Sequence, residues 1–323
     1  MHPSLEGIPD IWKEVFELVS QVPEGMVTTY GEVAKALGDP IAARFVGLAM
    51  STRPDMTYVP RGRVVRSDGS LGGNSSLGSV SEKAQSLKKE GIVVRDGRVV
   101  DMEDHLFIDF RSSKPLDLLK RRQRALKARV RLPSHRLKID KVAGADVSYS
   151  SDRAFASLIV FDAKTGDEVV RHQSVSEAPF PYIPTYLAFR ELPIIASLAR
   201  LLEDGTVLMY DGNGILHPER FGIASHAGIA FGLSTIGVAK KLLCGEIGET
   251  VAEGVASVRV KGEVRGYARS CGSGAPVFVS PGHGISAEQA LSTVSEFTRH
   301  RIPEPIRIAH QSATNARRLA INK

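Results

Sequence analysis

The sequence predicts two domains: a small winged helix-turn-helix domain over residues 1–110, and a larger α/β domain with a mixed sheet over residues 111–323. Three observations support this fold class. The chain of 323 residues is long enough to bury two separate cores. Helical spacing dominates its first part, whereas strand-like runs that alternate with helices dominate the rest. Both patterns dissolve in the stretch EDHLFIDFRSSKP, which marks the boundary.

The first domain is predicted from helix start and stop signals. Apolar side chains at helical spacing over residues 11–22 predict an amphipathic helix. The sequence TYGE has the threonine-to-glutamate spacing of a capping box, which opens a second, short helix. In LGDP, the aspartate and proline start a third helix over residues 41–50, so a helix-turn-helix is expected. The alternating sequence IVVRDGRVV around Asp96 and Gly97 predicts a hairpin that forms the wing.

The second domain is predicted from a change to strand periodicity. The runs VAGADVSY, FASLIVFD and EVVRHQSV follow one another and predict an antiparallel meander. A helix over residues 185–202, the strand TVLMYD, a glycine-rich loop, a helix over residues 225–233 and the strand TIGVA come next. This order, βββαβαβ, predicts a mixed sheet with helices on its faces.

The composition narrows the function classes. Hydrophobic residues make up 42% of the chain, and no apolar run approaches the roughly 20 residues of a membrane span, so we expect a soluble protein without a membrane partner. The sequence starts without an export signal, which predicts a cytoplasmic protein. The two cysteines, Cys244 and Cys271, exclude a disulfide scaffold and a cysteine-rich zinc site. The net charge of +6 has the sign expected of a protein that approaches a polyanion.

A basic run, KRRQRALKARVR, covers residues 120–131 and contains seven basic side chains. It is compatible with a helix whose charged face is solvated, which is the usual role of such runs. Contact with phosphate groups is the alternative.

Three acids lie where a fully buried carboxylate would be costly. Asp146 interrupts the first strand of the meander, Glu191 lies on the helix after it, and Asp211 ends the strand TVLMYD, where loops of α/β sheets commonly form sites. Converging carboxylates repel one another unless a cation neutralises them, and hard oxygen ligands suit Mg²⁺, with Mn²⁺ as a substitute. Such a site could hydrolyse a phosphodiester. Taken singly, each acid could instead be a turn former, a cap or an ion-pair partner.

Six blocks give this part of the chain a specific resemblance. AGADVSY, PYIPTYLAFRE, DGNGILHPERFGIASHAG, TIGVAKKLL, SPGHGIS and PEPIRIAH occur in this order over about residues 115–323 and resemble the successive motifs of endonuclease V. That family is ribonuclease H-like and nicks nucleic acid near deaminated adenine. The resemblance implies that Asp146, Glu191 and Asp211 hold the metal. One departure is Gly284 in SPGHGIS, where the family pattern implies an arginine.

The resemblance also implies roles for residues around the acids. A wedge with Tyr182 at its tip would enter the duplex beside the lesion, so that hypoxanthine rotates into a pocket. Glycines would let the backbone approach the flipped base. A histidine and a lysine would lie near the reacting phosphate, and a late histidine near the metal. These residues are Pro181, Tyr182, Ile183 and Pro184 in the wedge, Gly212, Gly214 and Gly222 in the pocket, and His217, Lys240 and His310 near the reaction.

The first domain resembles the DNA-binding domain of O6-alkylguanine-DNA alkyltransferases over roughly residues 8–103, through TTYGEVAKALG, PIAARFVGLAM and RVVRSDGSLGG. The resemblance implies that Arg44 replaces a rotated base and that Tyr30 presses on the adjacent phosphate. The family's acceptor motif, Pro-Cys-His-Arg, is here PRGR, with Arg61 in place of the thiol. Arginine stays protonated and cannot capture an alkyl group. The domain therefore resembles alkyltransferase-like proteins, and Arg61 either contacts a phosphate or base or fills the pocket.

The resulting hypothesis is a DNA repair endonuclease that nicks the strand 3′ to deoxyinosine, with a cysteine-less alkyltransferase-like domain that binds DNA. A non-cleaving damage sensor is the first alternative. A bifunctional methyltransferase and endonuclease, with the first activity in name only, is the second. The sequence leaves open whether alkylated DNA or RNA is also bound, whether one or two metal ions are used, and which oligomeric state the protein adopts.

Overall fold

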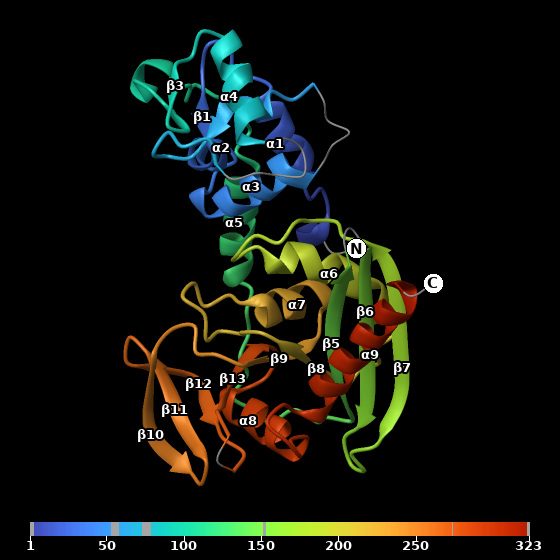
Figure 1. Ribbon diagram of the computed structural model, residues 1–323. Coiled ribbons are helices and arrows are strands. Elements are labelled where there is room, and N and C mark those ends of the chain that lie inside the picture. Colours follow the sequence, from blue (N-terminus) through green and yellow to red (C-terminus); the bar gives the residue numbers. More distant parts are fainter. Residues whose placement is uncertain (1–2, 53–57, 73–78, 151–152, 273, 322–323) are drawn as a thin grey trace. The chain divides into compact units, whose positions relative to one another are not determined.

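The computed structural model describes residues 3–52, 58–72, 79–150, 153–272 and 274–321 (Figure 1). The chain forms two compact units. The smaller unit contains residues 8–121 and also residues 180–186. The larger unit contains residues 1–7, 122–179 and 187–323, so each unit is built from more than one stretch of the chain. None of the helices in the described ranges is long and apolar enough to cross a membrane.

The first three helices of the smaller unit begin after capping residues, of which Thr29 and Asp39 were predicted from the sequence. α1 (Ile11–Val19) starts after Asp10, whose carboxylate accepts from the amide of Lys13. α2 (Tyr30–Ala36) starts after Thr29, whose hydroxyl accepts from the amide of Glu32. The third helix starts with a 3₁₀ turn, η2 (Pro40–Ala42), before α3 (Ala43–Thr52), because Asp39 caps the turn through the amide of Ile41. The predicted helix-turn-helix is therefore present, with a tighter start than expected.

The predicted wing is also present. β3 (Val94–Arg95) pairs antiparallel with β4 (Arg98–Val99), and Asp96 and Gly97 between them both have positive φ, as a two-residue turn of this kind requires. The sequence did not predict β1 (Thr28–Thr29), which pairs in parallel with β2 (Val64–Val65). It also missed α4 (Val80–Lys89) and the 3₁₀ turns η1 (Pro3–Leu5, larger unit), η3 (Arg61–Arg63) and η4 (Met102–His105).

The larger unit contains a nine-stranded mixed sheet in the order β10-β11-β12-β13-β9-β8-β5-β6-β7. The predicted meander is present as three antiparallel neighbours, and β5, β8 and β9 are mutually parallel, as predicted. The four strands before the last two helices extend the sheet and were not predicted. The strands are β5 (Lys141–Ser150), β6 (Arg153–Asp162), β7 (Glu168–Glu177), β8 (Thr206–Asp211), β9 (Ser234–Ala239), β10 (Glu246–Ala252), β11 (Val255–Val260), β12 (Glu263–Arg269) and β13 (Val277–His283).

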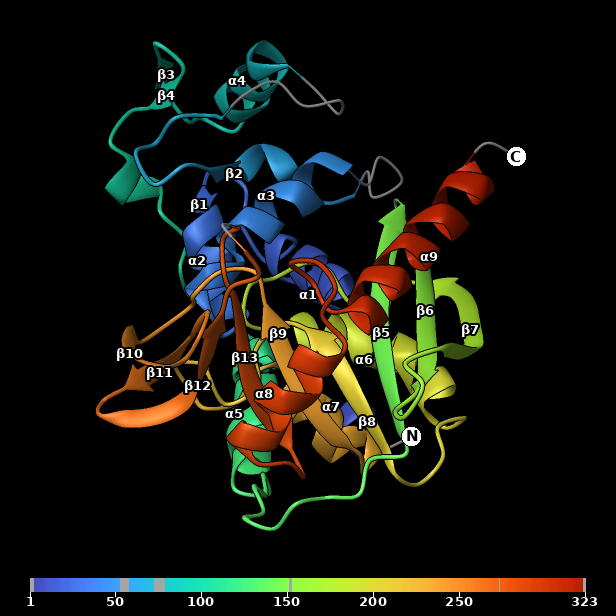
Figure 2. The ribbon, with the colours of Figure 1, turned by 90° about the horizontal axis from the view of Figure 1, so that it is seen from below.

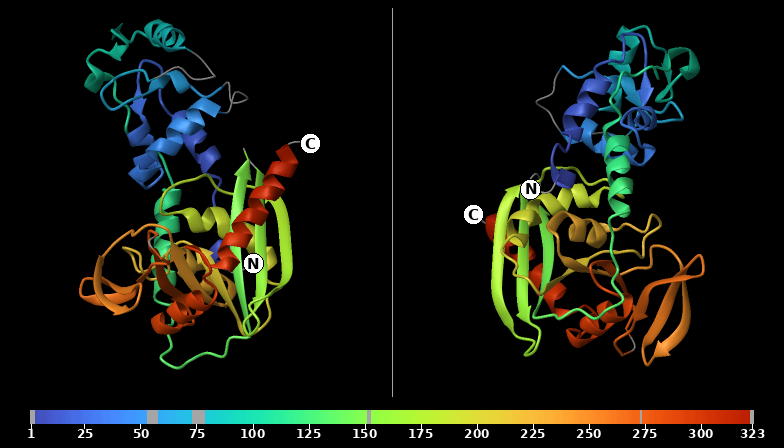
Figure 3. Two further views of the ribbon diagram at one scale, coloured as in Figure 1. Left: turned by 60° about the horizontal axis from the view of Figure 1, so that its bottom comes forward. Right: turned by 180° about the vertical axis from the view of Figure 1, so that it is seen from behind.

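Helices cover both faces of this sheet (Figure 2, Figure 3). α6 (Leu187–Ala199) and α7 (Ile223–Phe231) pack with Ala143, Ala145 and Val147 of β5 on one face. α8 (Ala287–Glu296) and α9 (Glu304–Ile321) pack on the other face, where Val142 of β5 is buried. Alternate residues of a strand point to opposite faces, so β5 is buried on both sides and an acid within it faces one helix layer. α5 (Pro115–Lys127) precedes β5, and the division between the two units falls within this helix.

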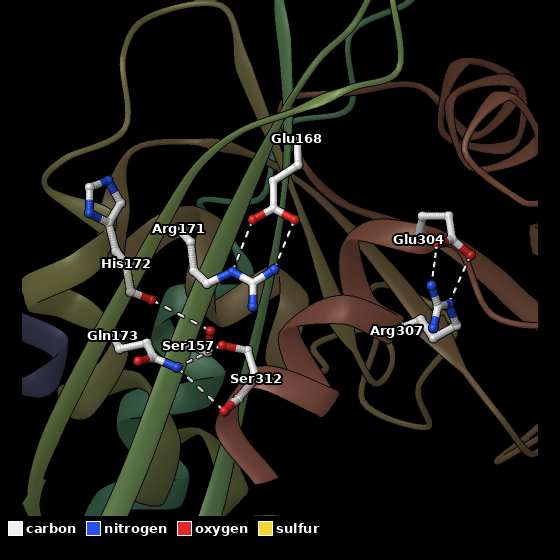
Figure 4. Close-up of polar contacts among 8 residues, drawn as sticks. All are labelled: Ser157, Glu168, Arg171, His172, Gln173, Glu304, Arg307 and Ser312. Carbon is white, nitrogen blue, oxygen red and sulfur yellow. Dashed lines mark hydrogen bonds and ion pairs between the residues drawn. The ribbon is translucent and has the colours of Figure 1, made fainter. Parts of the chain in front are cut away.

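Polar contacts hold α9 in place (Figure 4). The side-chain amide of Gln173 on β7 donates to the hydroxyl of Ser312 at 2.7 Å, and Glu304 and Arg307 form an ion pair in the first turn of the helix. Gly144 of β5 lies against the start of α9, where an added Cβ would overlap the carbonyl of Pro305. These contacts fix the position of α9 along β5.

Candidate active site

Two of the predicted acids lie at the same level on neighbouring parallel strands, Asp146 within β5 and Asp211 at the end of β8. Ala145 of β5 lies opposite Tyr210 of β8 in the last pair of their register, and Asp146 and Asp211 are the next residues. Neighbouring strands run about 4.8 Å apart. Both acids have the strand parity of residues buried under α8 and α9, such as Val142, so their side chains point to the same face. The two carboxylates therefore lie side by side at the carboxyl end of β8.

Glu191 reaches this point from α6. The hydroxyl of Tyr210 donates to its Oε2 at 3.1 Å. Burial and the charges of Asp146 and Asp211 together raise the pKa of Glu191 to about 8. The structure thus brings together the three acids, Asp146, Glu191 and Asp211, which are called the acidic triad below.

Basic side chains lie beside two members of the acidic triad. Burial raises the pKa of Asp146 to about 6, the charge of Asp211 adds to this, and His310 opposes it. Nδ1 of His310, on α9, lies 3.0 Å from Oδ2 of Asp146. Nζ of Lys240, just after β9, lies 2.5 Å from Oδ2 of Asp211. Lys240 and His310 therefore lie beside the acids, and the ammonium group of Lys240 offsets part of their repulsion.

The acidic triad has the donor chemistry of a site for a hard divalent cation. As the side chains stand, two of the acids are paired with Lys240 and His310, and no three His, Cys, Asp or Glu side chains of the described residues form a closed metal-binding group. Yet the carboxylates raise one another's pKa, so they are near enough to repel. A divalent cation would relieve this repulsion through oxygen ligands, which it prefers.

The glycine loop, residues 212–222, follows Asp211 and is folded tightly against the sheet. An added Cβ at Gly214 would overlap the carbonyl of Pro281 on β13, and one at Gly222 would overlap the carbonyl of Asn213. Gly212 has a φ of 150°, which favours glycine. The close approach of neighbouring backbone therefore requires glycine at Gly214 and Gly222 in the loop after Asp211.

His217 belongs to the same loop but is not joined to the acids. Its Nδ1 accepts from the amide of Glu219 at 3.2 Å, and burial lowers the pKa of its ring. Within the described part of the chain, no hydrogen bond or ion pair links His217 to the acidic triad.

The segment that carries Tyr182 belongs to the smaller unit. Tyr182 is 64% exposed and Pro184 is exposed, whereas Pro181 and Ile183 are buried and support the turn from inside. The segment ends at Tyr186, which is 1% exposed and whose hydroxyl donates to Oδ2 of Asp39 at 2.8 Å. The four residues implied for the wedge thus form one turn, and the ring of Tyr182 is exposed at its surface.

Asp39 receives several donors in addition to Tyr186. Burial alone would raise its pKa, but hydrogen bonds from the amide of Ile41, from Tyr186 and from Lys120 hold the pKa below its usual value. Lys120 approaches to 3.1 Å. Asp39 therefore stays charged. It caps the 3₁₀ turn before α3 and also holds Tyr186, at the end of the 180–186 segment.

The remaining predicted residues of the smaller unit differ in exposure. Arg44 of α3 is exposed. Tyr30 is half-buried beside Gly47, and burial raises the pKa of its hydroxyl. Arg61 points inward: its guanidinium donates to the carbonyl of Met50 at 3.0 Å and lies over the ring of Phe16. In this arrangement Arg61 fills space inside the unit, which is one of the two alternatives that the sequence left open.

Two family models match the chain. The model described as endonuclease V matches residues 124–311, which is more than half of the chain. The chain belongs to the endonuclease V family. The model described as the DNA binding domain of 6-O-methylguanine DNA methyltransferase matches residues 10–92. Both resemblances that the sequence motifs indicated are thereby confirmed.

Relatives of endonuclease V type cover either the whole chain or its larger unit. A protein of Picrophilus torridus named bifunctional methyltransferase/endonuclease is 37% identical over 96% of this chain and 97% of its own length. Endonuclease V of Thermofilum pendens is 45% identical over 54% of this chain and 77% of its own. A structure of Ciona intestinalis endonuclease V, in complex with a 24mer DNA containing an inosine followed by a ribo-adenosine, is 28% identical with a TM-score of 0.59 and covers 64% of this chain and 100% of that chain.

Family membership makes this chain a DNA repair endonuclease, and endonuclease V proteins are generally metal-dependent. The one departure from the endonuclease V pattern has a structural reason. Gly284 has a φ of 68°, and an added Cβ would lie 2.7 Å from the hydroxyl of Ser234. An arginine would be strained there, so the local backbone of this chain favours glycine.

The sequence did not predict the residues that hold the predicted site residues in position. Tyr210 hydrogen-bonds Glu191, and Asp39 and Tyr186 anchor the exposed turn. The sequence carried a signal for Tyr210, because it precedes Asp211 in a buried strand and a buried tyrosine hydroxyl needs a partner. Asp39 and Tyr186 lie 147 residues apart, and no local pattern connects them.

Proposed function

We propose that this chain nicks DNA strands 3′ to deoxyinosine by metal-assisted hydrolysis of a phosphodiester, leaving 3′-hydroxyl and 5′-phosphate ends. The observation that carries the proposal is the convergence of Asp146, Glu191 and Asp211 at the carboxyl end of β8, beside a loop of close-packed glycines. The inosine-containing DNA bound to the Ciona intestinalis relative supports deoxyinosine as the lesion.

The acidic triad would hold Mg²⁺, or Mn²⁺ as a substitute, with His310 beside Asp146. When bound, the metal would lower the pKa of the attacking water and neutralise charge on the phosphate. Lys240 lies within reach of the same point, and its ammonium group offsets negative charge that develops on the phosphate. His217 would relay a proton, because burial lowers the pKa of its ring and so favours the neutral imidazole, which accepts a proton at one nitrogen as it releases one from the other.

Each unit carries residues that we expect to take part in base rotation. In the larger unit these are Gly212 and Gly214, in the loop that follows Asp211. Tyr182, exposed between Pro181 and Pro184, would fill the space that the base leaves, and Ile183 supports the turn from within. Unstacking a base costs a few kcal/mol, less for a mismatched pair such as one with hypoxanthine, which would favour the lesion.

We propose that residues 1–110 act as the DNA-binding module and residues 111–323 as the nuclease. Arg44, exposed on α3, would contact the duplex as a residue of the helix-turn-helix, and Tyr30 lies beside the same helix. Two linked DNA-binding modules raise the effective concentration of the second site once the first is bound. Duplex DNA is the partner of this module, with alkylated DNA as a further substrate to be tested.

The test is a nicking assay on deoxyinosine-containing duplex with Mg²⁺, compared with the same duplex carrying deoxyadenosine. The wild-type protein is expected to nick one strand near the lesion. Asp146→Asn should lower the rate by more than about 100-fold, because it removes a direct metal ligand rather than an outer partner. Asp167→Asn, in the exposed hairpin between β6 and β7, is the matched control and should leave the rate unchanged. A protein that binds the lesion without nicking it would be a damage sensor, and the proposal would fail.

A further inference from the structure

A groove with a volume of about 370 Å³ lies within the larger unit, next to the glycine loop. One wall comes from the end of α5 and the residues after it, and the other comes from Ile215 and Arg220 of the glycine loop. Its lining combines cationic and apolar side chains: Arg124, Lys127, Ala128, Val130, Leu132, Ile215 and Arg220.

The groove is fixed to the loop that starts at Asp211. Leu126 and Val130 of the same segment pack against Phe221 and Ile229 in one apolar cluster, and Val130 also lines the groove. The amide of Arg131 then donates to Nδ1 of His283 at 3.2 Å, which holds the segment against the end of β13. The cationic wall is therefore a built part of the nuclease unit and packs against the loop that follows Asp211.

The seven cations of the basic run divide into two groups. Those at its start have partners within the chain: Lys120 pairs with Asp39, and Arg121 pairs with Asp117. Arg122 donates to the carbonyl of Glu6 at 2.7 Å. Arg124 and Lys127 are exposed, and neither forms an ion pair or side-chain hydrogen bond with any residue that the structure describes. Arg131, farther along, donates to the carbonyl of Ala128, and Arg129 does not line the groove. Arg124 and Lys127 are therefore the two cations of the basic run that line it.

The opposite wall is also positive. Arg220 and Arg265 share the single carboxylate of Glu263, at 2.8 Å and 3.1 Å respectively. Two guanidinium groups and one carboxylate leave one net positive charge, held in place by the pairing. With Arg124 and Lys127, the groove is lined by three net positive charges above an apolar floor.

We propose that this groove binds the phosphodiester backbone of the DNA strand that enters the nuclease site. Arginine and lysine at the rim would contact phosphates, while Val130, Leu132 and Ile215 would lie under sugars. The proposal rests on the proposed function in taking DNA as the partner. It adds a surface that the acidic triad and the Tyr182 turn do not include, and it gives affinity without reading sequence.

The experiment compares the double variant Arg124→Ala/Lys127→Ala with the wild-type protein. Binding to a fluorescent duplex is followed by anisotropy in the presence of a chelator over a series of salt concentrations. Loss of two phosphate contacts lowers the slope of log K against log salt by about 1.8. If the two proteins bind equally at about 1 M salt, the variant binds roughly 60-fold more weakly at about 0.1 M. Both residues are exposed, so the fold should be retained.

The matched control is Lys164→Ala/Arg200→Ala, which removes one lysine and one arginine from exposed positions away from the groove. Its slope should stay close to that of the wild-type protein. A duplex without deoxyinosine should show the same slope change for the groove variant, because backbone contacts carry no sequence information. An unchanged slope in the groove variant, or an equal loss in the control, would overturn the proposal.

The salt slope and the nicking assay distinguish failure of the groove proposal from failure of the nuclease proposal. The wild-type protein is assayed separately for nicking, at saturating concentration and low salt, together with the groove variant. If nicking occurs but the slope is unchanged, the groove proposal is wrong and the nuclease proposal stands. If the slope falls but the wild-type protein does not nick, the nuclease proposal is wrong and the groove proposal stands. Below saturation the groove variant should nick more slowly than the wild-type protein, because it binds the duplex more weakly.

Discussion

Glu191→Gln should stabilise the protein when no divalent metal is present, although it removes a member of the acidic triad. The native carboxylate has a pKa of about 8, against 4.5 as the ordinary value, because it is desolvated and faces two other acids. Between these values the native state keeps a proton that the unfolded chain has lost. Wild-type stability therefore falls as the pH rises from about 4.5 to about 8. A glutamine has no proton to lose and still accepts from Tyr210.

The size of the effect follows from the pKa difference. A change from 4.5 to about 8 corresponds to about 5 kcal/mol at pH 8 and above, and to almost nothing below pH 4.5. Glu191 keeps some exposed surface, which lowers its desolvation, so we expect about 2–5 kcal/mol. Asp146, whose pKa is raised to about 6, adds a pH dependence of the same sign in both proteins.

The assay is urea unfolding of both proteins in chelator at about pH 5 and about pH 8. Glu296→Gln, an exposed glutamate of α8, is the control and should change stability by less than about 0.5 kcal/mol at either pH. Added Mg²⁺ should reverse the order, because only the wild-type site gains the full binding free energy of the metal. A variant that is less stable than the wild type at pH 8 in chelator, or a difference independent of pH, would refute the account of the acidic triad.

Three further predictions concern other parts of the chain. Tyr186→Phe and Asp39→Asn should each cost about 1 kcal/mol in unfolding free energy, and the double variant should cost less than their sum; strict additivity would contradict the coupling of these residues. Gly214→Ala should destabilise the larger unit by about 1–3 kcal/mol in thermal unfolding and slow nicking, whereas Gly31→Ala, which meets no close contact, should do neither. Incubation with DNA carrying labelled O6-methylguanine should leave no label on the protein, because residues 60–63 contain no thiol; stable labelling would show that another nucleophile acts.

The central strands and the acids were predictable because their signals are local. β5, β6 and β8 are buried, so their sequences are apolar runs bounded by turns. β10 is exposed along its whole length and has no buried face that would impose alternation. Its pairing with β11 depends on tertiary contacts, and so the extension of the sheet beyond β9 was missed.

The arrangement of the site required the register of the sheet. The sequence placed Asp146 and Asp211 at strand positions, but the pairing of β5 with β8 is what sets them at one level. His310 lies 164 residues from Asp146, and only the packing of α9 over β5 brings them into contact. The motif blocks carried this information through resemblance, since spacing alone could not have chosen His310 over the other histidines.

The 180–186 segment changes what the smaller unit contributes. The proposed boundary between residues 110 and 111 treats the two halves as separable along the chain, yet this segment packs with residues 8–121. Tyr186 gives its hydroxyl hydrogen to Asp39 and is almost completely buried, so a chain without residues 1–110 would leave that hydroxyl without its charged acceptor. The exposed ring of Tyr182 is four residues away on the same turn. A unit without a reactive thiol can therefore still serve repair, because it holds in place the aromatic side chain that would probe the duplex.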